Sequence, residues 1–98
     1  MKEVEYEKLS VFYKMLSDNT RLRILDVLLE ESLCVNDICT KLNMSQSAIS
    51  HQLINLRKAN LVKTNKIGKN ALYRIMTGTT SQIFKIINNI TIINDCLK

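Results

Sequence analysis

Two short helical patterns separated by about three residues constrain the fold of this chain more than any other feature. In residues 35–42, apolar side chains recur at intervals of three and four. A second helix begins after Ser45, and its apolar residues share one side in the same way: Ile49, Leu53 and Leu56. Asn43 suits the end of the first helix and Ser45 suits the N-cap of the second. Two such helices joined by a tight turn predict a helix-turn-helix.

The residues around this motif predict a winged form of it. Helical spacing over residues 4–16, and again from Leu22 to about Glu31, predicts two helices before the motif. Ser17 or Asp18 can cap the second of these helices. After Asn60 come two short runs with β-branched or aromatic residues, "LVKTNKI" and "NALYRI", with Gly68 and a lysine between them. That pattern predicts a β-hairpin, which would be the wing.

The C-terminal segment predicts a further helix, near residues 80–97, that is apolar on more than one side. The predicted fold is therefore mainly α with a β-hairpin (α+β), a winged helix-turn-helix with four helices, two strands and a last helix. We expect residues 1–98 to form one domain. Because the last helix must bury more than one side, we expect a homodimer whose interface is formed by the helices near 4–16 and 80–97.

Charge is distributed unevenly along the chain. The net charge is +5, but residues 1–37 hold eight acids and five bases, whereas residues 38–94 hold eight bases and no Asp or Glu. A long acid-free, basic segment indicates a surface that approaches a polyanion. Neither a signal peptide nor a membrane span is visible, and three cysteines at irregular spacing do not predict a disulfide framework. These features predict a cytoplasmic protein with reduced thiols and no membrane partner.

The outer face of the second motif helix carries short polar side chains in place of the usual Glu and Lys. The first turns of a recognition helix enter the major groove of double-stranded DNA, where such side chains reach base edges and phosphates. Gln46 can pair with adenine, Ser47 and Ser50 can serve bases or phosphates, and Ile54 can touch a thymine methyl. The only histidine, His51, is interpreted as a DNA contact. Lysines are expected near the DNA backbone: Lys58, Lys63, Lys66 and Lys69.

The stretches "MLSDNTRLRILDVLLEESLCVNDIC" and "LNMSQSAISHQLINLRKANLVKTNKIGKNALYRI" resemble the ArsR/SmtB family of bacterial and archaeal transcriptional repressors. The resemblance runs from about residue 9 to 75. It implies a homodimer that binds an inverted-repeat operator when unliganded and is released by an inducer. It assigns the recognition role to Gln46, Ser47, Ser50, His51 and Gln52, and the wing role to Lys66 and Lys69.

The inducer stays open, because the sensor residues of the family match only in part. Arsenic sensors carry Cys-Val-Cys-Asp-Leu-Cys, and the corresponding stretch, residues 34–39, keeps Cys34 and Cys39 but has Asn36 in place of the middle thiol. Zinc sensors use Asp and His on the last helix, which has no His here. The sulfur-sensing branch pairs a cysteine matching Cys39 with one near Cys96.

Three interpretations of the cysteines remain. Cys34, Cys39 and Cys96 can bind a soft metal(loid) such as arsenite or cadmium. A thiol pair can instead sense reactive sulfur species or oxidants. Cys39 lies on an apolar stripe and can also be a plain core residue.

Two other classes of function are alternatives to a DNA-binding repressor. An enzyme is not predicted, because there is no CxxC, no Cys–His pattern and no glycine-rich phosphate loop. A winged-helix module that binds protein is the other alternative, and affinity for duplex DNA as a function of salt discriminates the two.

Overall fold

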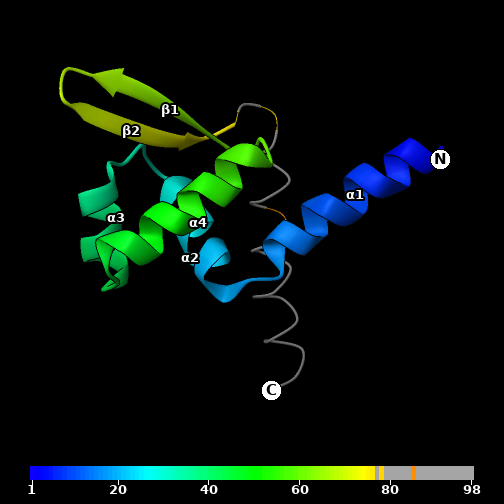
Figure 1. Ribbon diagram of the computed structural model, residues 1–98, viewed down its shortest axis with the longest axis horizontal. Coiled ribbons are helices and arrows are strands. Elements are labelled where there is room, and N and C mark those ends of the chain that lie inside the picture. The colour runs from blue at the N-terminus through cyan, green and yellow to red at the C-terminus, as the bar shows by residue number, and fades with distance from the viewer. Residues whose placement is uncertain (77, 79–84, 86–98) are drawn as a thin grey trace.

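A computed structural model describes residues 1–76 together with 78 and 85, and within that part four helices precede an antiparallel hairpin (Figure 1). The elements are α1 (Glu3–Leu16), α2 (Asn19–Leu28), α3 (Val35–Leu42), α4 (Gln46–Lys58), β1 (Val62–Ile67) and β2 (Asn70–Ile75). The predicted winged helix-turn-helix is confirmed. Apart from position 85, the predicted helix near 80–97 lies outside the described residues, as does Cys96.

The turn between α3 and α4 is formed by local interactions of residues that the sequence already singles out. Asn43 takes a left-handed conformation with φ 54°, which Asn tolerates better than most residues, and this ends α3. The backbone N–H of Met44 then donates to the carbonyl of Cys39 at 3.1 Å. One residue later, Ser45 Oγ accepts a hydrogen bond from Ala48 N–H at 3.2 Å and so caps α4. Both predicted helix ends are confirmed.

Helix α2 begins as predicted but ends earlier. Asp18 caps it by accepting a hydrogen bond from Arg21 N–H at 3.0 Å. The helix stops at Leu28 rather than near Glu31. The reason lies in β2: Leu33 forms an isolated bridge with Tyr73, with N–H···O distances of 3.0 and 2.8 Å. The chain must already be extended at Leu33 to make that bridge, so the helix cannot continue.

The hairpin forms the wing and projects from the helical body (Figure 1). Its register pairs Val62 with Ile75 at the base and Ile67 with Asn70 at the tip. Gly68, with φ 62°, lies in the connecting turn, where a residue without Cβ avoids steric cost. Val62 and Ile75, at the base of the hairpin, are buried, while the residues at its tip are exposed. The basic tip is thereby held away from the core.

The core holds α2, α3, α4 and the base of the wing together. Its most completely buried side chains are Ile24, Leu25, Ile38, Ile49, Leu53, Leu56 and Val62. Only Leu16 is buried among the residues of α1, which extends from the body (Figure 1). No helix in the described part of the chain is long and apolar enough to cross a membrane.

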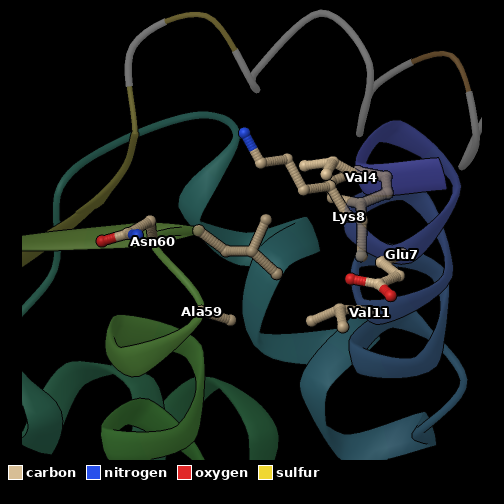
Figure 2. Close-up of a pocket in the computed structure, with 8 residues that line it drawn as sticks. Val4, Glu7, Lys8, Val11, Ala59 and Asn60 are labelled. Carbon is tan, nitrogen blue, oxygen red and sulfur yellow. The ribbon is translucent and has the colours of Figure 1, made fainter. Parts of the chain in front are cut away.

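An open groove of about 590 Å³ separates α1 from the turn between α4 and β1. Figure 2 shows Val11 and Glu7 reaching from α1 towards the space that faces Ala59 and Asn60. Apolar side chains of α1 are largely exposed: Val4 59%, Tyr6 53%, Leu9 43%, Val11 55% and Tyr13 54%. The first helix therefore lacks apolar partners over most of its length among the described residues.

Candidate nucleic-acid interface

Helix α4 has one buried side and one exposed side. Ile49, Leu53 and Leu56 are at most 1% exposed, and they anchor the helix on α2 and α3. The opposite side consists of residues spaced by four, three and four positions, and all are exposed: Ser47, His51, Ile54 and Lys58. We call these four residues the outward stripe. Because the core fixes the rotation of α4, the outward stripe is presented to solvent as a fixed row.

The N-terminal end of α4 adds polar groups beside the outward stripe. Gln46 is exposed in the first turn, Ser50 is half-buried on the flank, and Ser47 Oγ lies 3.5 Å from the capping Ser45 Oγ. The first turn of α4 contains no acidic residue. A helix N-terminus with free N–H groups and hydroxyls favours an anion such as a phosphate.

Gln52 does not lie with the outward stripe. It is half-buried, and its Oε1 accepts a hydrogen bond from Arg21 Nη1 at 3.4 Å. Arg21 also donates from Nε to the carbonyl of Met15 at 2.8 Å, so it joins the end of α1, α2 and α4. Sequence reasoning missed this role of Arg21. The helical rotation of 100° per residue separates Gln52 from His51 and was the available signal.

Exposed lysines lie at the end of the outward stripe and on the wing that follows it. Lys58 ends α4, Lys63 and Lys66 are exposed on β1, and Lys69 lies at the tip of the wing. Neither α4 nor the hairpin contains a carboxylate. Lys41 differs from these lysines, because its Nζ lies 3.5 Å from Glu31 Oε1. The concentration of positive charge beside the polar stripe attracts a polyanion and is screened by salt.

Of the two described cysteines, Cys34 immediately precedes α3 and Cys39 lies within it. Cys34 is the N-cap residue, half-buried, and its thiol donates to Asp37 Oδ2 at 3.2 Å. Cys39 is half-buried and packs against the core. Over residues 1–76, 78 and 85, no group of three His, Cys, Asp or Glu side chains is placed to hold a metal ion. The third predicted sensor residue, Cys96, lies outside the described residues.

Comparison with known proteins identifies relatives of the whole helix-turn-helix region. The family model described as bacterial regulatory protein, arsR family, matches residues 18–64. The chain is 33% identical over 79 residues to a transcriptional repressor SmtB homolog of Synechocystis, covering 81% of this chain but only 60% of that protein. It is 36% identical over 91 residues to an arsenical resistance operon repressor of Staphylococcus aureus, covering 93% of this chain and 85% of that protein.

Solved structures show the same architecture. HlyU from Vibrio cholerae superposes with a TM-score of 0.83 at 29% identity, covering 91% of this chain and 97% of that one. Its reduced form gives a TM-score of 0.81 at 30% identity, covering 90% and 93% of the two chains. HlyU is named as a transcriptional activator. The relatives therefore share a regulatory role, with both repressors and an activator among them.

Proposed function

Because the chain belongs to the arsR family of bacterial regulatory proteins, we propose that it represses transcription by binding double-stranded operator DNA through the outward stripe of α4. The observation that carries this proposal is the contrast between the two sides of α4. One side is locked in the core, and the other presents the polar Ser47 and His51 in one exposed row with Ile54 and Lys58. Such a helix suits the major groove, where side chains read base edges.

The proposed contacts divide into base contacts and backbone contacts. Gln46, Ser47, Ser50 and His51 contact base edges or nearby phosphates, and Ile54 provides an apolar contact. Gln52 can donate from its amide nitrogen while its carbonyl oxygen accepts from Arg21. Contacts to the phosphate backbone come from Lys58, Lys66 and Lys69.

Base reading is tested by selecting a duplex from a random pool with the wild-type protein. Ser47→Ala and His51→Ala should lower affinity for the selected duplex more than for an unrelated one, by about 1–3 kcal/mol for each good base contact. Lys69→Ala should weaken both duplexes and lower the slope of log affinity against log salt by about 0.9. Lys41→Ala is the matched control, since that lysine is paired with Glu31.

Two results contradict the proposal. Equal losses on both duplexes for Ser47→Ala and His51→Ala would mean that the outward stripe does not read bases. Absence of any salt-dependent affinity for duplex DNA would favour a protein-binding module. A reporter gene downstream of the selected sequence distinguishes repression from activation. Its expression should fall when the protein is supplied if the protein is a repressor, and rise if it is an activator.

We also propose that the chain acts as a homodimer, with residues 1–98 as one domain and the helices near 4–16 and 80–97 as the interface. Support comes from the exposed apolar side chains of α1, among them Leu9 and Tyr13. A two-fold dimer reads an inverted repeat with half-sites about one helical turn apart. Sedimentation at micromolar concentration should give a dimer, and Leu9→Glu should dissociate it while the exposed Glu3→Lys should not. A stable wild-type monomer contradicts this proposal.

For the inducer, we propose a thiol-bound soft metal(loid) such as arsenite or cadmium, held by Cys34, Cys39 and Cys96. The likeness to an arsenical resistance operon repressor supports it. A second candidate is a reactive sulfur or redox signal, which the likeness to HlyU, a protein also solved in its reduced form, favours. The test is DNA binding by wild type and each Cys→Ser variant, titrated with arsenite, cadmium or a polysulfide donor. If every variant responds as wild type does, the cysteines are core residues.

A further inference from the structure

A second groove runs beside α4, on the flank next to the outward stripe. It has a volume of about 460 Å³ and lies between α1, α2 and the C-terminal half of α4. Its lining residues are Val11, Lys14, Met15, Arg21, Asn55, Lys58 and Ala59. Three of these side chains are cationic, and none of the lining residues described is acidic. The groove is therefore a positively charged recess with an amide at its edge.

Arg21 is held in place within this groove before any ligand binds. Its Nε donates to the carbonyl of Met15 at 2.8 Å and its Nη1 donates to Gln52 Oε1 at 3.4 Å. These bonds use two of the five N–H donors of a guanidinium, so the others remain for an anion. A fixed guanidinium binds phosphate through two parallel hydrogen bonds, with little loss of side-chain freedom.

The groove is continuous with the proposed base-reading surface. Lys58 belongs both to the outward stripe and to the groove, and Asn55 lies one position beyond Ile54 on the groove side of α4. A duplex whose major groove receives α4 carries phosphates on both sides of that helix. On the groove side of α4, the nearest cationic side chains from other helices are Lys14 and Arg21.

We propose that this groove binds a backbone phosphodiester of the operator and is a contact separate from the recognition helix N-terminus and the wing. The inference rests on the proposed function, because the position of the duplex beside the groove follows from its proposed contact with the outward stripe. Lys14 supplies a mobile positive charge from α1, and Arg21 supplies a fixed fork from α2. The first helix then contributes to DNA affinity directly.

The first test is the salt dependence of binding by Lys14→Ala, measured by fluorescence anisotropy on the selected duplex. Because Arg21 still contacts the same phosphate, loss of Lys14 should lower the slope of log affinity against log salt by up to about 0.9, which corresponds to up to about eightfold weaker binding at 0.1 M salt if affinities match at 1 M. Lys8→Ala is the matched control. Lys8 is also exposed on α1, but it lines the other groove. Circular dichroism checks that both variants fold.

The second test locates the phosphate. Single phosphates of the duplex are replaced by neutral methylphosphonates, and one replacement should weaken wild type more than it weakens Lys14→Ala, because the variant has already lost the Lys14 part of the contact and keeps only the Arg21 part. If wild-type affinity depends steeply on salt but Lys14→Ala and Lys8→Ala show the same slope, the phosphate contact in the groove is refuted while the proposed function stands. A wild type without salt-dependent binding overturns the proposed function instead. A third outcome also overturns the proposal. If inorganic phosphate shifts the NMR signals around Lys14 but no methylphosphonate position distinguishes wild type from Lys14→Ala, the groove binds a free anion and not the operator.

Discussion

Replacing Ser45 with alanine should destabilise the protein through one hydrogen bond at the start of α4. Ser45 Oγ accepts from Ala48 N–H at 3.2 Å, and this satisfies one of the backbone donors that have no partner within the helix. Alanine at position 45 cannot accept that bond. Position 48 is alanine, so no side chain reaches back to complete a capping box and compensate for the loss.

The expected cost of Ser45→Ala is about 1 kcal/mol, the middle of the range for loss of a serine N-cap. For a domain of this size, that cost lowers the melting temperature by about 4–8 °C. Ser10→Ala is the matched control. Ser10 is also exposed, but its Oγ donates to the carbonyl of Glu7 at 3.0 Å inside α1, away from any helix N-terminus. Its replacement should change stability by less than about 0.5 kcal/mol.

Urea denaturation followed by circular dichroism measures both variants, at one fixed protein concentration because association would also stabilise the folded chain. The midpoint for Ser45→Ala should fall while the slope of free energy against urea stays constant. If Ser45→Ala and Ser10→Ala have the same midpoint, the capping bond does not stabilise α4 and the reasoning is refuted.

Three further changes test other parts of the structure. Leu53→Ala removes a side chain that is 1% exposed and should cost about 2–5 kcal/mol in urea denaturation, against less than about 0.5 kcal/mol for Ile54→Ala, which is 52% exposed. Asn60 has φ 60°, so Asn60→Ala should cost about 1 kcal/mol while Asn60→Gly should not lower the melting temperature. Gln52→Ala removes the hydrogen-bond acceptor of Arg21 and should lower the free energy of unfolding by about 0.5–1.5 kcal/mol. If the variant loses duplex specificity but no stability, the structural role of Gln52 between α2 and α4 is contradicted.

The features predicted correctly from sequence are those that neighbouring residues determine. Asp18 and Ser45 cap helices through bonds to residues three positions ahead, and Asn43 ends α3 through its own backbone conformation. The wing follows from Gly68 between two short runs with β-branched or aromatic residues. The buried and exposed sides of α4 follow from helical spacing, so the sequence alone predicts the exposed side that carries the outward stripe.

The features that were missed depend on residues far apart in the chain. The early end of α2 follows from the bridge between Leu33 and Tyr73, which no local sequence pattern predicts. Arg21 and Gln52 are 31 positions apart, and their contact exists only because α2 packs against α4. The cationic groove has the same origin, since it brings Lys14 beside Lys58. Sequence periodicity showed which residues lie outside the core, but not which of them meet.

Cys39 connects thiol chemistry to the orientation of the recognition helix more directly than Cys34 does. Its carbonyl accepts the hydrogen bond from Met44 that closes the turn into α4, and its side chain packs against the core. An adduct on Cys39 must therefore displace packed atoms next to that turn, whereas one on Cys34 breaks only a bond to the exposed Asp37. A shift of α4 that changes operator affinity tenfold needs only about 1.4 kcal/mol of coupling. In the titrations of single variants, loss of Cys39 should then reduce the response more than loss of Cys34, and the reverse order would place the switch at the start of α3.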